Sequence, residues 1–459
     1  MTRKRNILYL AHRVPFPPNK GDKIRTFHQI ERLAASHNVW CGCFVDTSED
    51  RVHAAALHQW CRGVMAVEWN RNRARLRALK ALAGGGPLTL AAYESDALRR
   101  RIAQVCERVR FDVVTCFSAC MAPIALEVPA RRHVLDLCDA DSEKWRDYAD
   151  SAPFPASLLY AEEHGRLREY ELACLRRFNA TLVITQRERE ILDPGGRHRK
   201  LHVVTNGADL PMRAPAPAST RAAVISFIGA MDYRPNVEGI RWFVRWVWPL
   251  VREEAPHAKL MVVGRNPSAA VRCLDGRAGI SVIGEVSDVR PWLAGSRAVV
   301  APLQIARGLQ NKVLEAMAMR RPVVATPAVA RCLDARPGRH LLVGANAGAF
   351  ARGVLALCRS DRLCDAVGEA GYRFVAGYHS WPEAMARFES IVLGDLAVRP
   401  KHMDAKDRAE SGDRPATVGQ DVAPSRTSIF NRPYPGRSLQ SDFAARSGVL
   451  RGLAEYVRT

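Results

Sequence analysis

Short apolar runs alternate with longer amphipathic stretches along most of the chain, and this alternation predicts its secondary structure. A first series of runs lies at residues 7–11, 39–45, 64–67, 112–116, 133–136, 180–185 and 201–205. A second series lies at residues 224–228, 260–263, 280–283, 298–301 and 323–325. Helical stretches separate many of these runs, most clearly at 21–35, 157–178 and 237–253. Regular alternation of strand and helix predicts parallel sheets with crossover helices, so we expect an α/β protein with two doubly wound, Rossmann-like blocks.

The two series are separated by a turn at Asn206-Gly207 and a stretch rich in proline and alanine. We therefore expect an N-terminal domain at 1–205, a linker at 206–222 and a C-terminal domain at 223–395. Two such domains on one linker are expected to face each other across a cleft. Residues 396–459 are polar, with many prolines and glycines, which predicts a disordered basic tail.

The most informative stretch is AVVAPLQIARGLQNKVLEAMAMRRPVVA, residues 298–325. It predicts a strand, a loop containing Gly308, a helix capped by Asn311 and ended by Pro322, and another strand. Open amides at a helix start and the positive end of its dipole attract anions. Lys312 and Glu315 share one face of the first turn and could hold a pyrophosphate and a ribose diol. Dipole complementation by Glu315 beside a solvated Lys312 is the alternative.

Two further stretches follow strands and so carry candidate ligand-binding residues. After the first strand, HRVPFPPNKGDKIR places Gly21 and Asp22 at a helix start, where simple helix initiation is the alternative. This loop lacks GxGxxG, which argues against a dinucleotide cofactor. In LDLCDADSEKWRDYA, three carboxylates are expected to converge beside Ser142 and Trp145, and they could supply a catalytic base or stabilise charge. Helix capping is the alternative there, and the three carboxylates are Asp136, Asp139 and Asp141.

Composition narrows the class of protein. The chain is 47% apolar and 25% charged, which is typical of a globular protein, and no apolar run reaches the roughly 18 residues of a membrane span. The N-terminal apolar run is too short for a signal peptide, so we expect a cytoplasmic protein. Twelve cysteines without paired CxxC spacing predict reduced thiols and no metal site. A net charge of +21 favours anionic partners, but no nucleic-acid-binding pattern is present.

A basic amphipathic stretch, NRNRARLRALKALAGGG, begins at residue 70. Arginines and Lys80 interleave with leucines over residues 71–80, a pattern that can lie on anionic lipid. A solvated helix that packs its leucines on the sheet is the alternative.

Several motifs together resemble the glycosyltransferases of the GT-B fold, group 1 (retaining family 4), over roughly residues 6–393. These are TNGAD at the domain boundary, FIGAMDYRPN, LMVVGRNP, VIGEV-D and APL-GLQNKVLEAMA-RRPVVAT. The segments HRVPFPPNKGDKIRTFH and DLCDADSEKWRDYA look like the subgroup associated with PEP-CTERM/exosortase exopolysaccharide systems. The resemblance implies a nucleotide-sugar donor in the C-terminal domain, an acceptor in the N-terminal domain, and transfer without a metal ion or other cofactor.

Carried over by position, Glu315 matches the second glutamate of the family's E-x7-E motif, which binds the donor ribose. Gly308 matches the glycine after the first glutamate, whose own place is taken by Arg307. The family's usual Arg and Lys after the first strand of the second domain are also absent, because Ala230 and Asn236 stand near their places.

The resemblance places the remaining candidates in three groups. Arg234 and Lys312 are expected to neutralise the pyrophosphate. Asp139 lies near the position of a cleft histidine in relatives, so it is expected to act as acid/base or stabilising group, with Asp141 as the alternative. His12, Gly21 and Asp22 are expected on the acceptor side. The other expected donor contacts are Gly229, Gly264, Arg265, Gly284, Val286, Arg307, Gly308, Leu309, Gln310, Asn311 and Glu315.

The expected activity is transfer of a sugar from a nucleoside-diphosphate sugar to a hydroxyl of a lipid-linked or saccharide acceptor in exopolysaccharide or glycolipid synthesis. A nucleotide-sugar epimerase of the same fold is one alternative. A non-catalytic nucleotide-sugar-binding scaffold is the other, because Arg307 replaces a glutamate. A lipid-linked acceptor would place the protein on the inner face of the cytoplasmic membrane.

Overall fold

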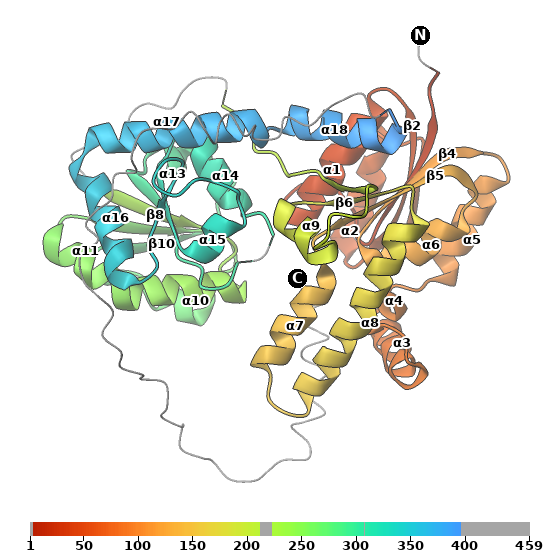
Figure 1. The fold of residues 1–459 in the computed structure, drawn as a ribbon, viewed down its shortest axis with the longest axis horizontal. Coiled ribbons are helices and arrows are strands. Elements are labelled where there is room, and N and C mark those ends of the chain that lie inside the picture. The colour runs from red at the N-terminus through yellow and green to blue at the C-terminus, as the bar shows by residue number, and fades with distance from the viewer. Residues whose placement is uncertain (1–2, 212–222, 307, 396–459) are drawn as a thin grey trace. The chain divides into compact units, whose positions relative to one another are not determined.

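Two parallel β-sheets, each accompanied by helices, form the framework of the protein (Figure 1). The structure is a computed structural model and describes residues 3–211, 223–306 and 308–395. The expected α/β class with two Rossmann-like sheets is confirmed. Most of the expected linker, residues 212–222, lies outside the described residues, as do Arg307 and the expected disordered tail, residues 396–459.

The first sheet has seven strands in the order β3-β2-β1-β4-β5-β6-β7, all parallel. They are β1 (Asn6–Ala11), β2 (Asn38–Val45), β3 (Gly63–Glu68), β4 (Phe111–Phe117), β5 (Ala130–Cys138), β6 (Ala180–Val183) and β7 (Leu201–Val203). The interior strand β1 buries residues 7–11 on both faces of the sheet. Burial on both faces explains why its sequence is a continuous apolar run rather than an alternating one.

The second sheet has six parallel strands in the order β10-β9-β8-β11-β12-β13. They are β8 (Val224–Ile228), β9 (Lys259–Val263), β10 (Ile280–Gly284), β11 (Ala298–Ala301), β12 (Val323–Ala325) and β13 (Leu342–Val343). The sequence predicts all of these except β13, which has only two residues and therefore no readable period.

Helices connect the strands of both sheets. In the first half of the chain they are α1 (Gly21–Ala34), α2 (Ser48–Ala56), η1 (Leu57–Gln59), α3 (Arg71–Gly84), α4 (Leu88–Ala92), α5 (Asp96–Cys106), η2 (Ala119–Met121), α6 (Ala122–Glu127), α7 (Asp141–Ser151), α8 (Ala156–Arg177) and α9 (Gln186–Leu192). In the second half they are α10 (Arg234–Trp242), η3 (Phe243–Val247), α11 (Trp248–Glu254), α12 (Ala269–Arg272), α13 (Arg290–Ala294), α14 (Asn311–Ala318), α15 (Pro327–Arg331), α16 (Ala347–Arg359), α17 (Asp361–Tyr378) and α18 (Trp381–Leu393).

The helix predicted at 237–253 is interrupted in the structure. Helix α10 leads into a π-helical turn, η3, before α11 begins at Trp248. Pro249 is the second residue of α11. Because proline has no backbone N–H and clashes with the preceding turn, the helix cannot run through it with regular hydrogen bonds.

The last described helix, α18, returns to the first sheet. Its Trp381 and Phe388 join the core cluster that contains Ile7 and Val39. The chain also crosses between the sheets near Gly207, where the N–H of Ala208 donates to the carbonyl of His379 over 2.7 Å. A Cβ on Gly207 would lie 2.3 Å from the backbone nitrogen of Trp381, so only glycine allows this approach.

A smaller helical unit is formed by residues 70–94 and 141–171, the described part of a second compact unit. It contains α3, α4, α7 and most of α8. Trp145 is fully buried in it and donates from Nε1 to Thr89 Oγ1 over 3.2 Å. The Glu163 carboxylate accepts from the N–H groups of Leu88 (2.7 Å) and Thr89 (2.9 Å) at the start of α4. None of the helices in the described ranges combines the length and apolar character needed to cross a membrane.

One buried ion pair ties α1 to the end of β5. Arg25 donates from Nε and Nη2 to the two oxygens of Asp136, over 2.7 and 3.1 Å, and both side chains are about 1% exposed or less. Gln29 adds a bond of 2.6 Å to Asp136, and Tyr9 donates to Gln29 over 2.5 Å. A buried pair of this kind is tolerated because each hydrogen-bonding atom finds a partner.

We expect Asp136→Asn to lower the free energy of unfolding by roughly 3–5 kcal/mol, because it leaves the Arg25 charge buried without a counter-charge. The matched control is Glu68→Gln, which breaks the exposed Arg51–Glu68 pair and should cost at most about 1 kcal/mol. Urea unfolding midpoints of the two variants provide the measurement. Equal midpoints would show that the buried pair adds no more stability than the surface pair.

Candidate functional site

The candidate site centres on the start of helix α14, after β11 and the loop 302–310. Asn311 is the first helical residue, Gln310 precedes it with φ −86° and ψ 87°, and no side chain caps the helix. The prediction that Asn311 is the N-cap is therefore wrong. The backbone N–H groups of Asn311 and Lys312 donate to no described residue. The helix start thus presents open donors and the positive end of its dipole.

Helix α14 also ends earlier than expected. Its last residue is Ala318, four residues before Pro322, and Arg320 adopts φ 52°. A left-handed residue ends a helix regardless of a later proline, so the end predicted at Pro322 is wrong.

The loop before α14 approaches the carboxylate that follows β5. Gly308 adopts φ 60°, and a Cβ there would lie 2.8 and 3.0 Å from the two carboxylate oxygens of Asp139. Asp139 is half-buried and follows a turn at Cys138, which has φ 62°. Glycine is thus required at 308 both for its conformation and for room beside Asp139. Leu309 and Gln310, also half-buried, complete the described loop.

The ammonium group of Lys312 lies close to the carboxyl end of β8. Its Nζ donates to Asn236 Oδ1 and lies 5.2 Å from the centre of the Phe227 ring. Burial lowers the pKa of Lys312 to about 7, and Glu315 only partly opposes that effect. The cation therefore occupies a place where a bound anion would stabilise it.

The carboxylate of Glu315 lies one turn along the same helix. It is half-buried, and no described residue hydrogen-bonds to it. Burial, followed by the nearby charge of Asp209, raises the pKa of Glu315 to about 7, against the lowering effect of Lys312. A half-buried acceptor without a protein donor is suited to hydroxyl groups of a ligand.

Asn236, rather than Arg234, contacts the Lys312 side of the site. Asn236 is 5% exposed, donates to the Ala230 carbonyl over 2.9 Å and accepts from Lys312. Arg234 begins α10 on its exposed side and pairs with Glu238 over 2.7 Å. From the sequence, Asn236 could be identified only as the residue near the place of the family's usual lysine. Its contact with Lys312 could not be predicted, because the two residues are far apart along the chain.

Three glycines lie at the carboxyl ends of adjacent strands of the second sheet. A Cβ on Gly264 would lie 1.6 Å from the Gly229 carbonyl oxygen, and one on Gly229 would lie 2.8 Å from Asn236 Nδ2. The backbones of Gly229 and Gly264 are therefore in contact. Gly284 has φ 80° and no atom within 4 Å of its Cβ position, so the space beside it is open.

Positive charge gathers near these strand ends. Arg265 follows Gly264 and is half-buried, as is Val286. Burial, then Arg13 and Arg265, lower the pKa of Lys20. Because these cations repel one another, an anion bound between them would be stabilised.

The carboxylates predicted to converge after β5 have different environments. Asp136 is buried in its ion pair with Arg25, so its expected place in the ligand site is wrong. Asp141 is the first residue of α7, in the smaller unit. The start of α7 receives the Glu171 carboxylate, which accepts from Ser142 N (3.1 Å) and Oγ (2.6 Å). Of the three, Asp139 is the one whose carboxylate lies beside the Cβ position of Gly308, in the loop before α14.

On the expected acceptor side, His12 Nε2 lies 3.5 Å from Asp22 Oδ2, and Arg13 Nη1 lies 3.2 Å from the same oxygen. The His12 ring stacks on Phe117 with 5.6 Å between centroids. Burial disfavours the Asp22 carboxylate, but Arg13 and His12 together outweigh it and lower the pKa of Asp22.

A chain of hydrogen bonds links this side to α14. Arg25 Nη1 donates to Asn206 Oδ1 over 3.0 Å, and Asn206 Nδ2 donates to Asn311 Oδ1 over 3.2 Å. Asn311 Nδ2 lies 3.9 Å from the position of a Cβ on Gly21. Asn311 therefore faces residues of the first sheet's domain. The NG turn in the sequence indicated a turn at Asn206 but not this contact.

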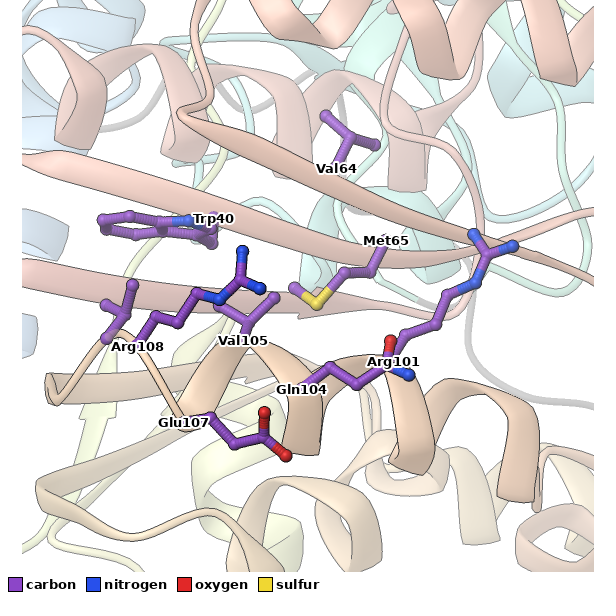
Figure 2. A pocket seen from close by; sticks show the side chains of 9 residues that line it. Trp40, Val64, Met65, Arg101, Gln104, Val105, Glu107 and Arg108 are labelled. Carbon is purple, nitrogen blue, oxygen red and sulfur yellow. The ribbon is translucent and has the colours of Figure 1, made fainter.

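Figure 2 shows a pocket of about 620 Å³ that lies apart from these residues. Trp40, Val64 and Met65 line it from near the amino ends of β2 and β3, and residues 101–109 from α5 and its end complete it. It includes none of the predicted site residues. Within the described residues, no three His, Cys, Asp or Glu side chains come together so as to hold a metal ion.

The sequence of residues 222–360 matches the model of a family described as Glycosyl transferases group 1. A comparison with curated protein sequences finds no match.

Solved structures with the same fold include sucrose-phosphate synthase from Thermosynechococcus elongatus, with a TM-score of 0.62 and 15% identity over 86% of this chain and 100% of that chain. HepE from Anabaena in complex with UDP has a TM-score of 0.61 and 13% identity over 85% and 100%. TarM, a protein of S. aureus, has a TM-score of 0.60 and 11% identity over 85% and 99%. Residues 222–360 therefore form a group 1 glycosyltransferase domain, and the chain that carries it is a nucleotide-sugar-dependent glycosyltransferase with the GT-B fold.

Proposed function

We propose that the protein transfers a glycosyl unit from a nucleoside-diphosphate sugar to a hydroxyl of a saccharide or lipid-linked acceptor, with retention and without a metal ion. The observation that carries the proposal is the pair on α14. Lys312 lies beside open helix amides, and Glu315, one turn later, offers a carboxylate with no described donor. A cation and an acceptor at this spacing suit a pyrophosphate and a ribose diol.

In this proposal the leaving pyrophosphate is neutralised by Lys312 and by the amides of Asn311 and Lys312. The charge that develops on the departing phosphate thus meets fixed positive groups, which is why we propose transfer without a metal ion. Gly308 lets the loop backbone approach the donor, and the open space at Gly284 leaves room for the nucleoside. Asp139, beside Gly308, acts on the sugar as acid/base or stabilising group.

The biological setting is also proposed. The motifs that look like the PEP-CTERM/exosortase subgroup favour exopolysaccharide or glycolipid synthesis in the cytoplasm, on the inner face of the membrane. HepE has been solved with UDP-glucose, which makes a UDP-sugar the first donor to test. Residues 71–80 are proposed to contact an anionic membrane surface, because five of these ten residues are basic.

We expect Lys312→Ala and Glu315→Ala each to lower the rate of nucleotide release by about 10²–10³-fold, since each removes one preorganised contact to the donor. Lys259→Ala and Glu254→Ala are the matched controls, because both residues are exposed and lie before or at the amino end of β9 rather than at the carboxyl ends of the strands. The donor is first chosen by thermal shift with a nucleotide-sugar panel. Full activity of both α14 variants would place the donor elsewhere, and a product that stays nucleotide-linked would favour an epimerase.

Donor affinity should have a maximum near pH 7. Below that pH Glu315, whose pKa is raised to about 7, is protonated and cannot accept from the ribose. Above it Lys312, whose pKa is lowered to about 7, loses its charge. Titration calorimetry with UDP-glucose across pH should show both limbs, and Glu315→Gln should remove the acid limb. A flat profile in the unaltered protein would contradict the assigned roles.

Asp139→Asn should lower kcat of transfer by about 10²-fold while donor affinity changes little, because the carboxylate acts on the reacting sugar rather than on the nucleotide. Asp141→Asn is the matched comparison, and it should retain most of the activity if Asp139 is the acting group. The reverse ranking would transfer the role to Asp141.

A further inference from the structure

The smaller helical unit exposes an unusual amount of apolar surface. Four large apolar side chains in it are between 46% and 78% exposed, namely Leu76, Leu79, Phe154 and Leu158. Leu76 and Leu79 lie on α3, whereas Phe154 and Leu158 lie at the turn between α7 and α8. Exposed side chains of this size grouped within one small unit indicate a surface that is covered in function.

Helix α3 has a buried face of small residues and an exposed face of leucines and basic residues. Ala74 and Ala78 are buried against the rest of the unit. Leu76 and Leu79, three residues apart, share the outer side of the helix. Around them stand basic side chains that pair with no described residue: Arg73, Lys80 and Arg75.

Another arginine of α3, Arg77, has partners within the unit and serves its fold. Arg77 donates from Nε and Nη2 to the carbonyls of Ala91 and Ala92, each over 3.0 Å, and so fixes α4 against α3. The segment 70–94 contains five basic residues and one acidic residue, Glu94. The outer side of α3 is therefore both apolar and positively charged.

The two apolar elements adjoin. Leu159 at the start of α8 packs against the cluster of Ala78 and Leu88, as does Leu82 of α3. Leu82 lies one helical turn after the exposed Leu79, and Leu159 directly follows the exposed Leu158. The contact that Leu82 and Leu159 share with Ala78 and Leu88 therefore brings the two exposed leucines near each other. Figure 1 shows α3 and the α7–α8 turn at the same end of this unit.

We infer that the smaller unit docks on an anionic lipid bilayer, with Leu76, Leu79, Phe154 and Leu158 inserted at the interface and the basic residues of α3 on the headgroups. The inference rests on the proposed function, because a lipid-linked acceptor is presented at such a surface. It extends the contact beyond residues 71–80 to the α7–α8 turn.

Charge and shape favour lipid over a protein partner. The exposed apolar side chains come from two elements, α3 and the α7–α8 turn with the start of α8, and the cations Arg73, Arg75 and Lys80 on α3 complement anionic headgroups. Near the α7–α8 turn the exposed Asp150 carries a negative charge, which anionic headgroups would repel. Electrostatic attraction to the headgroups is therefore expected at α3 and not at the turn. Insertion at the turn is thus apolar, and attraction at α3 is electrostatic.

Flotation of the full chain with vesicles tests the inference. The protein should float with vesicles of phosphatidylglycerol and phosphatidylcholine and much less with phosphatidylcholine alone. Leu76→Ser with Leu79→Ser, or Phe154→Ser with Leu158→Ser, should each lower the partition coefficient by roughly a hundredfold. Arg73→Glu with Lys80→Glu should lower it at least about thirtyfold on the anionic vesicles only.

Matched controls come from the larger unit. Val52→Ser removes a side chain that is 70% exposed on α2, and Lys259→Glu with Arg277→Glu reverses two exposed charges. Neither control should change flotation, and all variants should unfold at the same temperature. Unchanged flotation of the leucine and Phe154 variants would overturn the inference. So would a lipid-free dimer that these variants dissociate, since it would make a second copy the partner. Binding of UDP-glucose to the unaltered protein is measured in parallel, so that failure of the donor assignment is recognised separately.

Discussion

The buried pair of Arg25 and Asp136 connects segments of this protein that are far apart in the sequence. It joins α1 to the end of β5, and Arg25 also donates to the Val204 carbonyl and to Asn206. Asn206 in turn donates to Asn311, the first residue of α14. Removing one member would leave a buried charge, so the structure holds these segments in one arrangement. The start of α14 is therefore connected to this buried ion pair through Asn206.

Two ionisable groups at that helix start, Lys312 and Glu315, have pKa values that burial moves toward neutrality. Burial moves the pKa of Lys312 and that of Glu315 to about 7 from opposite directions. Their ionised forms are poorly solvated, and a donor would supply both an anion for the cation and hydroxyls for the carboxylate. A ligand of opposite charge or with hydrogen-bond donors stabilises the ionised form of such buried groups more than that of solvated groups. Perturbed pKa values are for this reason common in binding sites.

Much of the fold and part of the site follow from local sequence. Buried parallel strands are continuous apolar runs, so twelve of the thirteen strands in the described part of the chain could be located, and β13 was too short. Gly308, Lys312 and Glu315 could be predicted as site residues because strand, glycine loop and helix are adjacent in sequence. Asn236 and Asp209 could not be assigned their contacts, since their partners on α14 are roughly 75–105 residues away along the chain. Asp136 was misplaced for the same reason, because its partner Arg25 is distant in sequence.

By itself the sequence determined the two alternating series of strands and helices, the helix that carries Lys312 and Glu315, and the basic character of residues 71–80. These features depend on residues within a few positions of one another, where periodicity and propensity act. Tertiary structure alone decided which carboxylate is buried in an ion pair and which lies against Gly308. It also decided that Leu76 and Leu79 remain exposed while Ala74 and Ala78 are buried. Burial and charge pairing depend on segments that are far apart in the sequence and come together only on folding. The pattern of residues along the chain does not give the distances between such segments.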